Sequence, residues 1–169
     1  MRKLRMKKLF VYLDTSIISY LFADDTPEKR DITIEFFTKR LSSYNVYISD
    51  VVLFELSKTK DVAKRQMLED VIKKHNLSVL PISDIAGNDI SSIAEEYLQS
   101  GVIPPAKRED ALHVATCTYF EFDILLSWNF RHLANLHKQM QINSINERLG
   151  YLKRLNLVTP LEVMDENTD

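Results

Sequence analysis

The feature that most constrains the fold of this 169-residue chain is an unbroken apolar run at 9–13 that ends at an aspartate, Asp14. Such a run, with a β-branched valine inside it, predicts a strand that is buried on both faces of a parallel sheet. Residues 17–22 then have the character of a helix. Ligands of open α/β sheets bind at the carboxyl ends of the strands, so Asp14 is a candidate site residue. The alternative is that Asp14 only caps the helix that follows.

Strand-like and helix-like segments alternate along the rest of the chain, which predicts a parallel sheet with helices on both faces. The third strand contains Pro81, so we place it at an edge of the sheet. We expect strands at 9–13, 46–48, 77–82, 123–127 and 156–159, and helices at 27–41, after Asp50, at 61–75, 83–100, 109–117, 130–137 and 141–150.

The length of the chain predicts one domain over 1–169, with a basic segment at 1–8 and an acidic tail at 165–169 that we expect to be disordered. No apolar run approaches the roughly 18 residues of a membrane span, and the first residues lack the features of a signal peptide. We therefore expect a cytoplasmic protein with no membrane association. Its one cysteine, Cys117, excludes an internal disulfide and a cysteine-based zinc site.

The formal net charge of −2 argues against a protein that is held to nucleic acid by its overall charge. It does not exclude a nuclease, because a local basic patch and a bound metal ion are enough for a few phosphate contacts. Lys107 and Arg108, in the loop before the helix at 109–117, are candidates for such a patch. The alternative is that this pair belongs to an ordinary solvated loop.

Glu55 lies in the middle of a helix that is otherwise apolar on every side, and such a helix is expected to be buried. An unpaired buried carboxylate is costly, so Glu55 needs a cation, a set of hydrogen-bond donors or a proton. A buried ion pair with a nearby Lys or Arg is the alternative to a role in a site.

A second helix with a small, apolar interior carries Asp110 in its first turn and His113 one turn further along the same face. Stabilisation of the helix dipole would explain Asp110 without any site. His113 is either a ligand or a partly buried histidine that forms a hydrogen bond to a neighbour. We favour the second interpretation.

Asn129 follows the strand at 123–127 in the same way that Asp14 follows the first strand. One edge of the predicted sheet therefore receives four polar side chains, Asp14, Glu55, Asp110 and Asn129. Three converging carboxylates repel one another, and a divalent cation is the simplest way to keep them ionised. Oxygen ligands of this kind suit Mg²⁺ or Mn²⁺, whereas zinc would want histidine or cysteine, which this set of residues does not offer except for His113.

Three segments in this order, LDTSIISYL, EDALHVAT and ILLSWNFRHLAN, with the helix of Glu55 between the first two, resemble the PIN domain. The likeness extends over nearly the whole chain and is strongest to VapC-type toxin nucleases and their stand-alone relatives. It implies a three-layer α/β/α fold with a central, mostly parallel sheet of four to five strands, and usually a homodimer. It also implies metal-dependent cleavage of RNA and, for a toxin, an antitoxin partner.

By this resemblance the catalytic and metal-binding acids are Asp14, Glu55 and Asp110, with Mg²⁺ or Mn²⁺ as the cofactor. The hydroxyl after the first acid matches Thr15 or its neighbour Ser16, and Ser127 matches the residue that leads to a fourth acid. Asn129 stands in the place of that acid and brings no charge, so it is a weak metal ligand and binding of a second ion is in question. His113 is a further supporting candidate.

We therefore expect a metal-dependent endoribonuclease, in its specific form the toxin of a type II toxin–antitoxin pair. The alternative is a PIN-like module with weakened catalysis that binds RNA or a protein. A phosphatase of the haloacid-dehalogenase type would need a second Asp where Ser16 stands. A response-regulator receiver would need an acidic pair near the first strand and an acceptor Asp after the third. Asp84 lies beyond the third strand, but no partner pair is seen.

Overall fold

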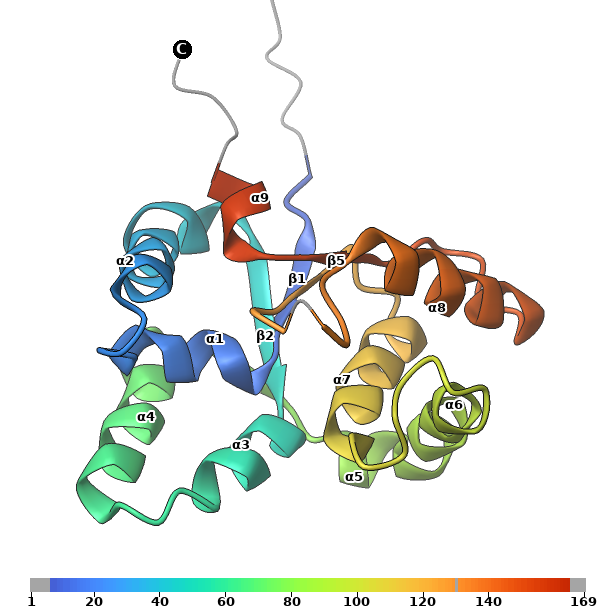
Figure 1. Cartoon of the computed structure of the whole chain (residues 1–169), viewed down its shortest axis with the longest axis horizontal. Coiled ribbons are helices and arrows are strands. Elements are labelled where there is room, and N and C mark those ends of the chain that lie inside the picture. The colour runs from blue at the N-terminus through green and yellow to red at the C-terminus, as the bar shows by residue number, and fades with distance from the viewer. Residues whose placement is uncertain (1–6, 130, 165–169) are drawn as a thin grey trace, which may run out of the picture.

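The computed structural model of the protein describes residues 7–129 and 131–164, and its centre is one five-stranded sheet (Figure 1). The strands lie in the order β3-β2-β1-β4-β5, and every neighbouring pair is parallel. They are β1 (Phe10–Leu13), β2 (Asn45–Ser49), β3 (Ser78–Leu80), β4 (Ile124–Leu126) and β5 (Asn156–Val158). The predictions of a parallel sheet and of an edge position for the third strand are confirmed, although Pro81 follows that strand instead of interrupting it.

Helices cover both faces of the sheet, which gives the three layers of an α/β/α fold (Figure 1). In Figure 1, α1, α2 and α4 lie on one side of the strands, and α6, α7 and α8 lie on the other. The α-helices are α1 (Thr15–Ser19), α2 (Pro27–Glu35), α3 (Asp50–Ser57), α4 (Val62–Lys74), α5 (Ile82–Ile85), α6 (Gly87–Gln99), α7 (Arg108–Tyr119), α8 (Leu136–Arg148) and α9 (Pro160–Met164). Three short segments complete them: the 3₁₀ helices η1 (Tyr20–Phe22) and η3 (Leu41–Ser43), and the π-helical η2 (Phe36–Arg40).

Strand β1 is central and buried on both faces, which explains its unbroken apolar run. Val11, Tyr12 and Leu13 are each no more than 1% exposed. In the register of β1 with β4, Leu13 lies opposite Leu126. The residues that follow these two strands, Asp14 and Ser127, therefore leave the sheet side by side.

The predicted helix boundaries need correction in three places. The helix expected at 27–41 changes character after Glu35, and the one expected at 83–100 is broken at Ala86, where φ is −148°. The short helix expected at 130–137 is wrong, because residues 131–135 form turns and α8 begins at Leu136. Two asparagine side chains explain this: Asn129 Oδ1 accepts from His132 N, and Asn135 Oδ1 caps α8 by accepting from Lys138 N.

Helix α3 is not the buried helix that its composition predicts. Only Val52 and Leu56 are buried, whereas Leu53 is 38% and Phe54 is 57% exposed. The reason is that α3 packs one face against α1, α4 and α7 and leaves the opposite face to solvent. Glu55 is accordingly only half-buried, at the margin of this packed face.

None of the helices in the described residues is both long and apolar enough to cross a bilayer. Residues 1–6 of the basic segment, Phe130 and the tail at 165–169 lie outside the described residues, so the expected disorder of the tail stays a prediction.

Candidate active site

The candidate site lies where the chain reverses its direction across the sheet. From β1 the chain moves outward to β2 and β3 on one side, and then returns to β4 and β5 on the other. Crevices at such reversal points, at the carboxyl ends of the strands, are where open α/β sheets bind ligands. Asp14 follows β1 here, and its backbone N–H donates to Leu126 O of β4 at 3.2 Å.

Asp14 is both the cap of a helix and a buried acid. Asp14 is only 3% exposed. Its Oδ1 accepts hydrogen bonds from Ser16 N at 3.0 Å and from Ser16 Oγ at 2.5 Å. Oδ2 accepts from Ser127 Oγ at 2.5 Å. Burial raises the pKa of Asp14, while the charge of His113 and the two serine hydroxyls oppose this shift. Ser16 and Ser127 thus act through Asp14 by fixing the direction of its carboxylate.

Glu55 is held by two donors and keeps one oxygen open. Oε1 accepts from Thr15 Oγ1 at 2.7 Å and from His113 Nε2 at 2.6 Å, so its partner is a histidine and not a lysine or arginine. Oε2 makes no hydrogen bond within the described residues. Partial burial raises the pKa of Glu55, but the bond and charge of His113, the Thr15 hydroxyl and Lys58 outweigh it and leave the pKa lowered.

His113 is a buried histidine whose two ring nitrogens both form hydrogen bonds. This agrees with the interpretation that we favoured, a histidine bonded to a neighbour. The residue is 1% exposed, and its Nδ1 lies 2.7 Å from Tyr12 Oη, which in turn lies 2.7 Å from Ser49 Oγ. Burial lowers the pKa of His113, yet Glu55 and the other two acids outweigh burial and raise it. Sequence analysis missed Tyr12 and Ser49 as residues of the site. For Tyr12, the signal was a polar hydroxyl inside a strand that is buried on both faces.

Asn129 meets Asp110 through its amide nitrogen. Asn129 Nδ2 donates to Asp110 Oδ2 at 3.0 Å, while Asn129 Oδ1 accepts from His132 N at 3.1 Å. A backbone N–H can only donate, so this second bond fixes the orientation of the amide. The atom that faces Asp110 is therefore a nitrogen, which is not a metal ligand, and the oxygen that we considered as a weak ligand is engaged elsewhere.

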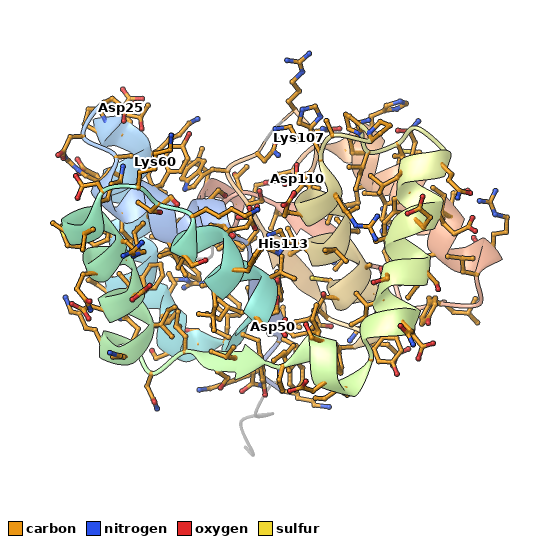
Figure 2. All side chains as sticks on the ribbon, turned by 90° about the horizontal axis from the view of Figure 1, so that it is seen from below. Asp25, Asp50, Lys60, Lys107, Asp110 and His113 are labelled. Carbon is orange, nitrogen blue, oxygen red and sulfur yellow. The ribbon has the colours of Figure 1, made fainter. Side chains whose placement is uncertain are left out.

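Asp110 is partly buried among like charges. Burial raises its pKa to about 6; the charges of Asp14 and Glu55 add to that rise, and those of His113 and Lys107 oppose it. Asp110 Oδ1 makes no hydrogen bond to a described residue. Figure 2 shows Asp110 and His113 following each other along α7, with Lys107 at the N-terminal end of the helix.

The donor chemistry of this cluster fits a hard divalent cation. Three carboxylates influence one another electrostatically, and Glu55 Oε2 and Asp110 Oδ1 carry no hydrogen bond that a metal would have to displace. Hard cations such as Mg²⁺ and Mn²⁺ take such oxygen ligands. Within the residues that the structure describes, however, no three His, Cys, Asp or Glu side chains already stand in an arrangement that could hold a metal ion.

Of the two basic residues that we considered beside the site, one forms an ion pair with a described acid and the other does not. Arg108 Nη1 lies 3.1 Å from Glu95 Oε2, so it is engaged on the outer side of α7. Lys107 makes no ion pair with a described acid. On the opposite lip, Lys58 Nζ lies 3.1 Å from Glu109 Oε1 and 4.2 Å from the centre of the Phe54 ring.

The raised pKa of Asp110 predicts that the metal-free protein loses stability as pH rises. The ordinary pKa is 3.8 and the folded pKa is about 6, so the folded protein binds more protons between these values. Asp110 should therefore contribute a fall of about 2 kcal/mol in the free energy of unfolding between pH 4 and pH 7. Urea unfolding in EDTA at several pH values measures this, and Asp110→Asn should show a smaller fall. Parallel pH profiles for the two proteins would contradict the prediction.

Comparison with known proteins agrees with the geometry. The family model of the PIN domain matches residues 11–139, which is more than half of the chain. The chain therefore belongs to the PIN domain family. PIN domains are generally nucleases that use a divalent metal.

One solved structure with the same fold is VapBC2 from Rickettsia felis bound to a DNA fragment from its promoter. A chain of that structure is 20% identical, with a TM-score of 0.51, and the match covers 73% of this chain and 90% of that chain. At this identity the match shows the fold alone. No curated protein matches this chain.

Proposed function

We propose that this protein is a metal-dependent endoribonuclease that hydrolyses RNA phosphodiester bonds. The observation that carries the proposal is that Asp14, Glu55 and Asp110 lie near one another at the reversal point of the sheet. There the negative charges of Asp14 and Glu55 raise the pKa of Asp110, and that of Glu55 raises the pKa of Asp14. Each acid alone has a structural explanation, since Asp14 caps α1 and Glu55 pairs with His113. Together they form a cluster that stability alone does not require, because like charges in a partly buried place are costly.

Asp14, Asp110 and Glu55 are the residues that would hold Mg²⁺ or Mn²⁺. When bound, such an ion supplies Lewis acidity and lowers the pKa of water. Thr15 and His113 both bond to Oε1, so Oε2 is the free oxygen of Glu55. Through it, Glu55 would either ligate the ion or accept a proton from the attacking water. The hydroxyls of Ser16 and Ser127 hold the Asp14 carboxylate in one orientation, which is the preorganisation that a site of this kind needs.

The test is cleavage of a mixed pool of single-stranded and structured RNA. We expect internal cleavage with Mg²⁺ or Mn²⁺, no cleavage with EDTA, and cleavage that is weaker by about 100-fold or more with Asp14→Asn. An RNA pool that stays intact with the wild-type protein and either ion would refute the proposal.

A second candidate function is a binding module with weakened catalysis. The observation that favours it is Asn129, which turns a nitrogen toward Asp110 where a fourth acid would stand. This candidate predicts that the protein retains RNA or a protein partner in pull-down experiments but leaves RNA intact in the cleavage assay.

We further propose an antitoxin partner, since a solved structure of the same fold is a VapBC2 complex, and a homodimer, which rests on the resemblance to VapC-type nucleases alone. An apolar groove of about 450 Å³ between η1, α2 and α4 suits an amphipathic segment of such a partner. Ile34 and Met67 line it and are 42% and 48% exposed. Copurification with the product of the neighbouring reading frame, followed by mass measurement in solution, tests both proposals.

A further inference from the structure

A group of basic side chains lies on the Asn129 side of the acid cluster. Lys107 precedes α7, while Arg131, His132 and Lys138 belong to the turns before α8 and to its first turn. Partial burial, and after it the charges of Arg131, Lys107 and Lys138, lower the pKa of His132, so the three cations lie near that ring. We call Lys107, Arg131, His132 and Lys138 the basic rim.

Hydrogen bonds attach the basic rim to the candidate active site. His132 N donates to Asn129 Oδ1 at 3.1 Å, and Asn129 Nδ2 donates to Asp110 Oδ2 at 3.0 Å. Lys107 acts on both sides of this connection, because its charge lowers the pKa of Asp110 as well as that of His132. Lys138 Nζ is fixed by donation to Val102 O at 2.5 Å. The rim is thus two hydrogen bonds away from a proposed metal ligand.

The charges around the acid cluster are unevenly compensated. On the lip formed by α3, Lys58 is paired with Glu109. In the basic rim, Lys107 and Arg131 are exposed, and neither forms an ion pair with any residue that the structure describes. Figure 2 shows Lys107 next to Asp110, whereas Lys60 lies across the face of the molecule, on the connection after α3. A polyanion that reaches the site therefore meets uncompensated positive charge mainly on the rim side.

We propose that the basic rim binds the backbone phosphates of the RNA strand next to the bond that is cleaved, so that the strand leaves the site over the N-terminal end of α7 and the turns at 131–135. The inference rests on the proposed function. Phosphate contacts from Lys and Arg fix the register of a nucleic acid without reading its sequence. They also explain how a chain of net charge −2 holds RNA, since only local charge is needed.

The experiment compares Lys107→Ala and Arg131→Ala, alone and combined, with Lys73→Ala and Arg154→Ala. The two control residues are exposed and lie away from the site, at the end of α4 and in the loop before β5. Binding of a fluorescein-labelled single-stranded RNA of mixed sequence is measured by anisotropy in EDTA, at several salt concentrations. We expect each rim variant to bind roughly 3–10-fold more weakly and to lose about one unit of salt slope, whereas the controls match the wild type. In the cleavage assay, KM should rise roughly 3–10-fold in the rim variants and match the wild type in the controls.

The outcomes separate this inference from the proposed function. If the wild type cleaves RNA and the rim variants bind and cleave like their controls, the rim is not the phosphate surface and the nuclease proposal stands. If RNA binding depends on Lys107 and Arg131 but no cleavage occurs with either ion, the surface stands and the nuclease proposal fails. A rim variant whose melting temperature and circular dichroism match those of the wild type excludes misfolding as the cause.

Discussion

In Asp14→Asn protein, we expect that Mn²⁺ no longer raises the melting temperature and that RNA cleavage falls by about 100-fold or more, because a bound metal would contribute several kcal/mol to the transition state. The wild type, with Mn²⁺ at about 100 times its Kd, should gain about 2.7 kcal/mol and a melting temperature higher by about 5–10 °C. The measurement is a thermal melt with and without Mn²⁺, together with the cleavage assay.

Folding is not the reason for the expected loss in Asp14→Asn. Asparagine keeps the size of the side chain and an oxygen that can accept from Ser16 N, so α1 stays capped. Burial raises the pKa of Asp14, so removal of its charge should leave the metal-free protein as stable as the wild type or more stable at neutral pH.

Asp61→Asn is the matched control for this prediction. Asp61 caps α4 by accepting from Lys64 N at 2.9 Å, but it is exposed and belongs to no acid cluster. This variant should keep both the Mn²⁺ shift and the cleavage activity. An undiminished Mn²⁺ shift in Asp14→Asn would remove Asp14 from the metal site.

Asn129→Asp should make the metal-free protein less stable and should raise the affinity of the protein for Mn²⁺. The change replaces a donor to Asp110 Oδ2, now at 3.0 Å, with a second carboxylate. Two carboxylates so close cannot both be ionised without a cation, so we expect a loss of about 2–3 kcal/mol in EDTA at pH 8. With Mn²⁺ the added oxygen ligand should raise the affinity by about tenfold or more. Urea unfolding in EDTA and calorimetric titration with Mn²⁺ measure the two effects.

Asn129→Ala separates the effect of charge from that of the lost hydrogen bonds. It removes the bonds to Asp110 and His132 without adding a charge, so it should cost about 1–2 kcal/mol and leave the Mn²⁺ affinity unimproved. Equal Mn²⁺ affinities of Asn129→Asp and the wild type would mean that Asn129 does not border the metal position.

The parts of the fold that follow from periodicity and burial were predictable from the sequence. The apolar run before Asp14 sets the central strand, and alternating strands and helices set the parallel sheet with its order of layers. The ends of helices were less predictable, because side chains distant from the helix pattern decide them. The turns at 131–135 depend on Asn129 and Asn135, whose amides compete with the backbone for its hydrogen bonds.

The acids of the candidate site were expected from the sequence, whereas Tyr12, Ser49 and the hydrogen bonds of the site were not. The positions of Asp14, Glu55 and Asp110 relative to strand and helix ends were enough to expect that they converge. Sequence could not show that His113 is the partner of Glu55, because a contact between α3 and α7 depends on how two helices pack. The direction of the Asn129 amide was also beyond the sequence, since a single backbone N–H of a later turn determines it.

The reversal point of the sheet also determines when such a site can exist during protein synthesis. Asp14 is synthesised before its neighbours on β4 and in the turn after it, which come more than 100 positions later in the chain. The partner strand of β4, β5, comes later still. The residues around Asp14 can therefore take their final positions only after β4 has been synthesised and has paired with β1.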